Sequence, residues 1–252
     1  MLRPDLASGA YIPQALGARV ARAARLRGPR PVIGDFARWG TGLLAGVPWT
    51  LPGHHGGFTF WGERYSYRFH PYKWSWLTER AVEVPIAQAV VDRHAGQRIL
   101  EVGNVLSHYR PQNHVIVDKY EQQPGVLNRD ALDLDDLGQF DLVVAVSTIE
   151  HVGWDEEPRE PEKAVEGLRR LEGLLAPGGQ LLVTVPVGYH PGLDAALSSG
   201  VFRFTRAAAL RRVGQTHWRE APPEEVWNVP YDFLLYSARA VFIGQIKRPS
   251  AA

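Results

Sequence analysis

Four short apolar runs in the middle of the chain constrain its fold more than any other feature. They are RILEV (98–102), HVIVD (114–118), FDLVVAV (140–146) and QLLVTVP (180–186). Runs of this length without polar alternation are typical of strands that are covered on both faces. Because longer crossover segments separate them, the runs predict a doubly wound α/β fold around a mostly parallel sheet.

The segments around these runs carry helix and strand patterns of their own. Residues 161–175 predict an amphipathic helix that Pro177-Gly178-Gly179 terminates. Residues 78–94 predict a second helix, in which Pro85 introduces a kink. The apolar stretch at 239–244 predicts a final strand at the edge of the sheet. We therefore expect one α/β domain over residues 81–252.

Residues 1–80 predict an N-terminal extension on the substrate side of that domain. Its first part is rich in Gly, Pro and Arg, with one helix from about Pro13 to Leu26 that ends at Gly28-Pro29. The stretch 58–76 then holds nine aromatic residues among 19. Alternation at Tyr65, Tyr67 and Phe69 indicates an extended segment.

Composition narrows the classes of function. The formal net charge is +1, so no overall field attracts nucleic acid or an anionic membrane. Residues 1–30 carry six arginines and one aspartate, 6 − 1 = +5, which we interpret as a solvated helix face. The absence of cysteine excludes disulfides, thiolate nucleophiles and Cys-based zinc sites. With no signal-peptide pattern at its start, the chain is expected to be cytoplasmic.

Polar residues follow directly after the predicted strands, where open α/β sheets bind their ligands. Glu101-Val-Gly103-Asn104 ends the first strand, and its glycine permits close approach of a ligand to the backbone. Asp118 ends the second strand, placed to accept hydrogen bonds from a ribose. Asp130 and Ala131 follow, where a carboxylate suits an adenine amino group. The third strand opens into Ser147-Thr148-Ile149-Glu150-His151.

With these residues in view, the chain resembles the class I S-adenosylmethionine (SAM) methyltransferases. EVG, the acid that ends the second strand, DA, IEHVG and LAPGGQLLVTVP carry the resemblance, over about residues 96–190. ILEVGNVLSHY, VDKYE, STIEHVGWDE and VPVGYHPGLD are similar to an uncharacterised microbial subgroup, which often has an upstream aromatic segment ending like TERAVE. The resemblance implies SAM as cofactor and S-adenosylhomocysteine (SAH) as product.

The resemblance and the strand ends together give the expected cofactor site. Its residues are Glu101, Gly103, Asn104, Asp118, Lys119, Asp130, Ala131, Ser147 and Thr148. In this site Glu101 would pair with a cationic group of the ligand.

The glycine-rich loop departs from the family pattern. In E-x-G-x-G-x-G the later glycines are replaced here by Val105 and Ser107. Gly103 and Asp118 are 118 − 103 = 15 residues apart, which leaves room for about two turns of helix at most. A dinucleotide site needs three glycines to seat a pyrophosphate on a helix N-terminus, so the loss counts more against NAD than against SAM.

Two histidines are candidate bases. His151 follows the third strand near the expected methyl position, and packing against the cofactor explains it equally well. His190 is the weaker candidate because Pro191 and Gly192 indicate a turn. Glu150 is expected to orient its neighbours. No metal site is predicted: Asp133, Asp135 and Asp136 are read as a solvated loop, and His54-His55 as a flexible one.

The aromatic stretch is interpreted as a lid over the site, with plain core packing as the alternative. Its candidate residues, with the neighbours that would join them, are Tyr72, Trp74, Trp76, Glu79, Arg80 and Tyr189. A surface Arg–Glu pair explains residues 79 and 80 equally well. If the lid is real, Trp76→Ala should weaken ligand binding more than it lowers the melting temperature.

The expected function is O- or N-methylation of a small-molecule acceptor, such as a sugar-bearing or secondary metabolite. The pattern gives no nucleic-acid or membrane partner and allows a homodimer. Two alternatives stay open: a SAM-binding enzyme of non-methyl chemistry, and a non-catalytic partner subunit whose altered loop no longer binds SAM.

Overall fold

A computed structural model describes residues 16–46 and 56–250 of the chain. Its centre is an eight-stranded sheet of order β5-β4-β3-β6-β7-β10-β8-β9. The strands are β3 (Ile99–Val102), β4 (Val115–Val117), β5 (Val126–Leu127), β6 (Phe140–Val146), β7 (Leu175–Pro186), β8 (Arg206–Arg212), β9 (Trp218–Ala221) and β10 (Ala240–Lys247). The five strands from β5 to β7 are parallel, whereas β10 and β9 run antiparallel to their neighbours.

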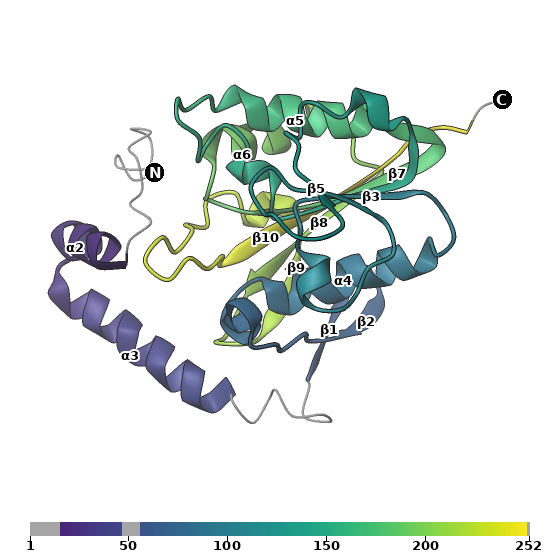
Figure 1. The fold of residues 1–252 in the computed structure, drawn as a ribbon. Helices are drawn as coiled ribbons and strands as arrows, with labels where there is room; N and C mark the ends of the chain where they lie inside the picture. Colours follow the sequence, from purple (N-terminus) through teal and green to yellow (C-terminus); the bar gives the residue numbers. More distant parts are fainter. Residues whose placement is uncertain (1–15, 47–55, 251–252) are drawn as a thin grey trace.

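Helices cover both faces of this sheet (Figure 1). Helix α4 (Arg80–Arg93) lies on one face, and α5 (Glu162–Gly173) with α6 (Pro191–Ser198) lies on the other. In β6 the side chains of Leu142 and Val144 join the α4 core, and those of Val143 and Ala145 join the α5–α6 core. Two covered faces explain the continuous apolar runs, and the predicted doubly wound α/β fold is confirmed.

The C-terminal part of the sheet differs from the prediction. Strand β10 is not an edge strand, because it pairs with β7 on one side and with β8 on the other. Strands β8 and β9 were not predicted, and β9 forms the edge. The Pro177–Gly179 segment does not terminate the helix: α5 ends at Gly173 and the segment lies inside β7. The pairing of β6 with β7 shifts in register at this segment, since Phe140 pairs with Leu175 and Leu142 pairs with Gln180.

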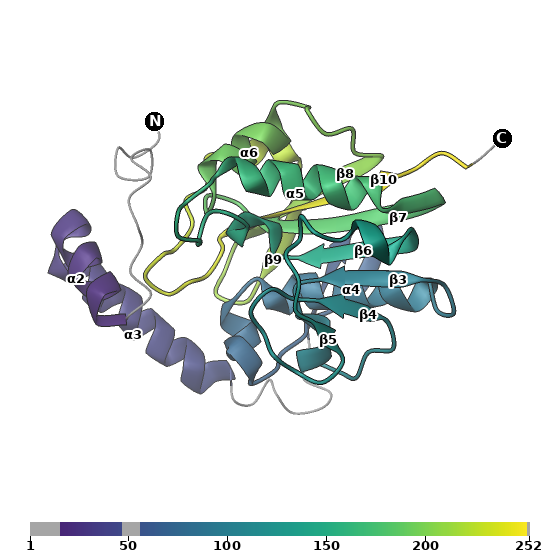
Figure 2. The ribbon, with the colours of Figure 1, turned by 45° about the horizontal axis from the view of Figure 1, so that its top comes forward.

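In the part of the N-terminal extension that the structure describes, two α-helices stand where one was predicted. Helix α2 (Leu16–Arg27) ends at Gly28, whose φ of +84° suits a left-handed cap. Helix α3 (Pro29–Gly46) begins at once, because a proline at the first helical position loses no hydrogen bond. Both helices lie beside the main body (Figure 2) and contact it through Leu234. Residues 1–15 and His54-His55 lie outside the described residues.

The aromatic stretch forms a small hairpin and a short helix against α4. Strands β1 (Gly57–Phe60) and β2 (Glu63–Ser66) pair with each other, and the 3-10 helix η2 (Tyr72–Leu77) follows. Tyr65, Tyr67 and Phe69 are all buried in the α4 core, as their alternation predicted. Over the described residues, no helix combines the length and hydrophobicity that crossing a membrane requires.

Four further 3-10 turns connect these elements. They are η3 (Leu106–His108), η4 (Asp135–Leu137), η5 (Ile149–His151) and η6 (Pro223–Glu225). Turn η3 occupies the place of the first crossover helix, so the prediction of at most two turns there is confirmed.

Candidate active site

A cavity of about 1110 Å³ opens at the carboxyl ends of β3, β6 and β7. Helix α3, η2 and the loop before β10 complete its wall. The structure brings eight of the predicted site residues to it: Tyr72, Trp74, Glu79, Arg80, Asn104, Ser147, His151 and Tyr189. The other predicted residues do not line it: Trp76, Glu101, Gly103, Asp118, Lys119, Asp130, Ala131, Thr148 and His190.

Glu101 is completely buried at the end of β3. Its Oε1 accepts hydrogen bonds from the backbone N–H groups of Val105 (2.9 Å) and Leu106 (2.7 Å). Its Oε2 lies 2.8 Å from Nε2 of His114, which is buried as well. The carboxylate therefore fixes the turn after β3 and is not exposed to pair with a ligand cation.

Gly103 and Asn104 form the turn itself. Gly103 has φ +84°, and a Cβ there would lie 2.0 Å from Oγ1 of Thr148, so only glycine fits. Asn104 donates its backbone N–H to Oδ2 of Asp118 (3.1 Å), and its Oδ1 accepts from Ser107. Its side-chain Nδ2 is buried without a partner. The turn thus presents one unused amide donor at the cavity.

The carboxylate of Asp118 accepts most of its hydrogen bonds from backbone N–H groups. Besides Asn104, the N–H groups of Tyr120 (2.9 Å) and Glu121 (2.8 Å) donate to its Oδ1. A carboxylate oxygen has two lone pairs, so Oδ2 retains one acceptor site.

Next to Asp118, Lys119 forms ion pairs with Asp130 and Glu156. The ammonium of Lys119 lies 2.7 Å from Asp130 Oδ2 and 2.9 Å from Glu156 Oε1. Desolvation raises the pKa of Asp130, but the hydrogen bond and charge of Lys119 together with the backbone N–H of Leu132 and the charge of Lys163 outweigh it, so the pKa is lowered. Asp130 is thus paired with a lysine in the place where an adenine amino group was expected. Ala131 is buried in the α5–α6 core.

His151 forms a pair with Asp155 that faces the cavity. Its Nδ1 lies 2.6 Å from Oδ2 of Asp155, and the hydroxyl of Tyr189 donates to the same oxygen at 2.6 Å. The imidazole packs edge-on against Tyr189 and stays 44% exposed. Desolvation lowers the pKa of His151, but the Asp155 hydrogen bond and the Glu150 charge outweigh it, so the pKa is raised.

His190 has a structural role, contrary to its prediction as a second base. It is the N-cap of α6, and its Nδ1 accepts from the backbone N–H of Leu193 at 3.0 Å. Its Nε2 lies 3.1 Å from the carbonyl of Pro161. Burial lowers the pKa of this fully buried imidazole to about 4. Both nitrogens are occupied away from the cavity.

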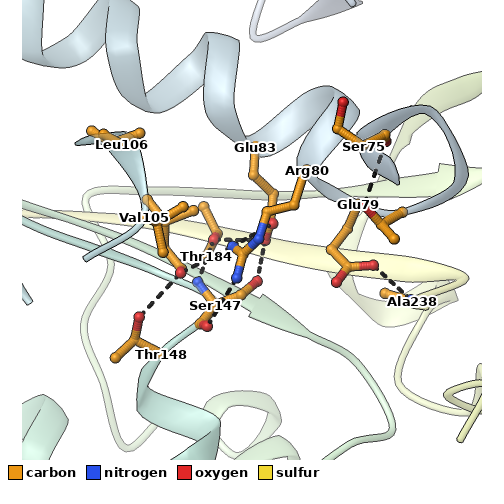
Figure 3. A network of polar contacts seen from close by, with 12 residues as sticks. Ser75, Glu79, Arg80, Glu83, Val105, Leu106, Ser147, Thr148, Thr184 and Ala238 are labelled. Carbon is orange, nitrogen blue, oxygen red and sulfur yellow. Dashed lines mark hydrogen bonds and ion pairs between the residues drawn. The ribbon is translucent and has the colours of Figure 1, made fainter. Parts of the chain in front are cut away.

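Arg80 is joined to the ends of β6 and β7 through the buried Glu83 (Figure 3). Nη1 of Arg80 donates to Glu83 Oε2 and to the carbonyl of Val146, each at 3.1 Å. Glu83 Oε1 accepts from Ser147 and from Thr184 Oγ1 (2.7 Å). Glu79 accepts from the backbone N–H of Ala238 instead, so the expected Arg–Glu surface pair between residues 79 and 80 does not form.

Ser147 sits at the centre of that network with a φ of +42°. This left-handed conformation is costly for a residue with a Cβ, and the hydrogen bonds from Ser147 to Glu83 and Thr184 hold it in place. The hydroxyl of Thr148 donates a hydrogen bond to the carbonyl of Val146. The chain leaving β6 is thereby turned toward the cavity.

Some of the predicted lid residues line the cavity, and others are buried in the core against α4. Tyr72 stacks on His108 with ring centroids 4.1 Å apart, and Trp74 is 50% exposed at the cavity. Trp76 is only 2% exposed and belongs to the α4 core, so it is not part of a lid. Trp76→Ala is therefore expected to lower stability first, contrary to the sequence-based expectation.

Several cavity residues were missed. Asp155, Arg212 and Tyr231 were not named as site residues, and Glu150 was given only an orienting role. The spacing of Asp155 four residues after His151 was a usable signal, because one turn of chain brings such positions together. Arg212 and Tyr231 come from β8 and from the loop before β10, where no residue pattern indicated a site.

The acidic cluster forms ion pairs. Arg129 lies 2.7 Å from Asp136 and 3.4 Å from Asp133, and Arg170 lies 2.8 Å from Asp135. Within residues 16–46 and 56–250, no group of three or more acids and histidines is arranged to hold a metal ion.

Comparison with known proteins gives likeness of structure only. No family model matches the chain, and no curated protein matches its sequence. The N-methyltransferase NodS from Bradyrhizobium japonicum WM9, solved with SAH, is 10% identical with a TM-score of 0.40, over 68% of this chain and 91% of that one. A second structure is 1,6-didemethyltoxoflavin-N1-methyltransferase from Burkholderia thailandensis, bound to 1,6-didemethyltoxoflavin and SAH. It is 14% identical with a TM-score of 0.40, over 67% and 79%.

A third similar structure is the ribosomal protein L11 methylase from Lactobacillus delbrueckii subsp. bulgaricus. It is 13% identical with a TM-score of 0.36, over 66% of this chain and 78% of that one. These proteins act on different acceptors by their names, and likeness at this level carries no information about the substrate of the present chain.

Proposed function

We propose that the chain is a SAM-dependent methyltransferase acting on a small molecule. The observation that carries the proposal is the meeting of two motifs at one cavity. The Gly103–Asn104 turn lies at the end of β3, and the His151–Asp155 pair follows β6. These are the segments in which the sequence resembles class I methyltransferases, and the carboxyl edge is where such sheets bind ligands.

The turn after β3 supplies groups that fit SAM. Asn104 has an unused amide donor at the cavity, which suits the carboxylate of the cofactor, and Asp118 has one free acceptor site for a ribose hydroxyl. Gly103, Ser147 and Thr148 shape the backbone between them. When bound, SAM supplies an electrophilic methyl group on its sulfonium.

Asp130 is paired with Lys119, so this ion pair must open before Asp130 can contact the cofactor. In this proposal Asp130 accepts from adenine only after Lys119 leaves it, with Ala131 packed below. Glu101 acts indirectly, because it holds the turn and does not contact the ligand.

His151 is proposed as the base. Asp155 accepts from Nδ1, so the proton of the neutral imidazole sits there and Nε2 is left as the acceptor. No hydrogen bond to Nε2 forms among the described residues, and the nearest acid oxygen is 3.6 Å away. Nε2 can therefore take a proton from an acceptor held in the cavity.

The N-terminal region up to residue 80 supplies the substrate-side wall in this proposal. Tyr72 and Trp74 offer aromatic faces at the cavity, and α3 closes its outer rim. A ring-bearing or sugar-bearing acceptor fits such a wall.

Isothermal titration of the full chain with SAM and with SAH tests the proposal. Micromolar binding is expected, and Gly103→Ala should abolish it because the new methyl group collides with Thr148. The absence of any affinity below the millimolar range would overturn the proposal in favour of a non-catalytic subunit. Tight SAM binding with no methylated product in a mass-spectrometric acceptor screen would favour non-methyl chemistry.

A further inference from the structure

Glu150 is a buried acid that the proposed mechanism does not use. It belongs to the turn after β6, and its side chain is 1% exposed. It forms part of the cavity wall beside His151. No other described residue donates a hydrogen bond to either carboxylate oxygen, and the backbone N–H of Glu150 itself is the one donor that acts on it. A buried carboxyl group without a donor costs free energy that a partner would recover.

The other acids of the cavity wall have partners. Asp35 accepts from Arg38, and Glu79 from the backbone of Ala238. Asp155 accepts from His151 and Tyr189. Asp232 accepts from two backbone N–H groups and from Arg239. Among the described acids that line the cavity, only Glu150 has no hydrogen-bond donor from another residue.

Charged neighbours surround Glu150 without satisfying it. Nε2 of His151 lies 3.6 Å from Oε1, beyond hydrogen-bond distance. Arg80 attracts it from α4, but that guanidinium is hydrogen-bonded to Glu83 and to the carbonyl of Val146. Burial dominates and raises the pKa of Glu150 to about 8, against the charge of His151 and the backbone N–H of Glu150 itself, which lower it, while Glu83 on the same helix raises it further. Because the imidazole of His151 is held to Asp155 through Nδ1 and stops 3.6 Å from Oε1, a ligand ammonium would supply the direct hydrogen bond that no other described side chain makes.

The position of Glu150 in the cavity suits contact with the methyl acceptor rather than with the cofactor. The charge of Glu150 acts on Tyr231, whose ring packs against Tyr189 at 5.0 Å on the wall formed after β7 and before β10. The cofactor turn at Gly103 and Asn104 follows β3, on the other side of β6. Tyr189 and Tyr231 line the same cavity as Glu150, and aromatic side chains in a pocket favour an ammonium group.

We propose that Glu150 is the recognition residue for the ammonium group of an amine acceptor. This inference rests on the proposed function and narrows its acceptor from any small molecule to an amine. The negative carboxylate would accept charge-assisted hydrogen bonds from the ammonium, beside the Nε2 of His151 that takes a proton.

The test compares two probes of nearly equal shape on the full chain saturated with SAH. Benzylammonium carries the charge, and benzyl alcohol is its neutral counterpart. Isothermal titration is run on the wild type, on Glu150→Gln and on Asp194→Asn. Asp194 is a matched control, because it is a buried acid with an unpartnered Oδ1 that does not line the cavity.

Wild type should bind benzylammonium more tightly than benzyl alcohol. Glu150→Gln should weaken benzylammonium by about ten- to a hundredfold and leave benzyl alcohol within about twofold. Asp194→Asn should bind both probes as the wild type does. In the unmodified protein, the carboxyl carbon of Glu150 followed by NMR should titrate at lower pH once benzylammonium is added.

Three results would overturn the inference: no amine-selective binding in the wild type up to tens of millimolar, unchanged amine affinity in Glu150→Gln, or equal loss of both probes. A fall of SAH affinity alone in Glu150→Gln would assign the carboxylate to the cofactor, which also overturns it. If the wild type bound no SAH, the proposed function would fail separately, and the NMR titration would still decide the role of Glu150.

Discussion

The carboxyl edge of the sheet has two parts, and they differ in whether the acidic side chains there receive hydrogen bonds from the protein. At the β3–β4 edge, Glu101, Asp118 and Asp130 are filled with donors from the chain itself. At the β6–β7 edge, Glu150 has none, and His151 keeps Nε2 unbonded at the cavity. The acids of the first edge mainly hold the fold, with one acceptor site left on Asp118, whereas the carboxylate of Glu150 at the second edge has no donor from another described residue.

This difference should separate stability from binding. A substitution at the β3–β4 edge removes hydrogen bonds that the fold needs, so it should cost stability and lose binding only as a consequence. A substitution at the β6–β7 edge removes a group that burial penalises, so it should spare or raise stability while binding is lost.

The largest effect is expected for Glu101→Ala. It leaves the N–H groups of Val105 and Leu106 and the ring of His114 buried without their acceptor. Breaking a buried pair in this way costs roughly 3–5 kcal/mol of unfolding free energy. Urea unfolding followed by circular dichroism measures it. A loss below about 1 kcal/mol, as is usual for a surface substitution, would mean that Glu101 does not hold the turn.

Glu150→Gln should change stability in the opposite direction, by an amount that grows as the pH rises from about 5 to 8. The unfolded chain releases this proton near pH 4.5, whereas burial keeps it in the folded chain up to about pH 8. The folded state therefore binds more protons between these values, and wild-type stability falls as the pH rises through them. Glutamine removes this loss.

We expect Glu150→Gln to exceed the wild type by roughly 2–5 kcal/mol at pH 9. At pH 5, where the wild-type carboxyl is protonated, the two proteins should agree within about 1 kcal/mol. Urea titrations at both pH values decide the matter. Equal stability at pH 9 would show that the carboxylate has a donor and would remove the contrast between the edges.

The sequence predicted the parts of the fold that follow from burial on two faces. Strands β3, β4, β6 and β7 are continuous apolar runs, and both sheet faces proved to be covered. Strand β8 was missed because Arg206–Arg212 consists of alanine, leucine and arginine, which favour helices more than strands. Helix α3 was missed because Pro29, Pro31 and its glycines suggested a loop.

The candidate site was predicted only as far as the strand ends reveal it. The positions of Asn104, Ser147 and His151 at the cavity follow from the parallel topology. Whether a carboxylate at a strand end is free depends on the path of the next few backbone N–H groups, which a residue pattern does not encode. Glu101 and Asp118 were therefore identified as strand-end acids, but their hydrogen-bond partners could not be foreseen.

Lys119→Met tests the closed edge with a smaller effect. The lysine is 35% exposed, so its ion pairs with Asp130 and Glu156 should contribute no more than about 1 kcal/mol to stability. A ligand donor competes with Lys119 for Asp130, and its removal frees that carboxylate. SAH should bind roughly three- to tenfold more tightly, up to about 1.4 kcal/mol. Weaker SAH binding in Lys119→Met would show instead that the lysine contacts the cofactor.

The smallest effect, and the most local, concerns the base at the open edge. Desolvation lowers the pKa of His151, and the hydrogen bond that its Nδ1 donates to Asp155 raises it. Asp155→Asn removes that charge, so the pKa of His151 should fall, as measured by NMR titration of the imidazole. His70 serves as an internal control, since burial and the charge of Arg68 lower its pKa and Asp155 does not act on it.

The linked stability has a definite sign. Because the folded pKa of His151 is raised, its contribution is present below the unfolded pKa and is lost as the pH rises through the folded one. Asp155→Asn should therefore lower stability at pH 5 more than at pH 9. An unchanged His151 titration in this variant would mean that Asp155 serves Tyr189 alone, and that the open edge holds its base by packing rather than by charge.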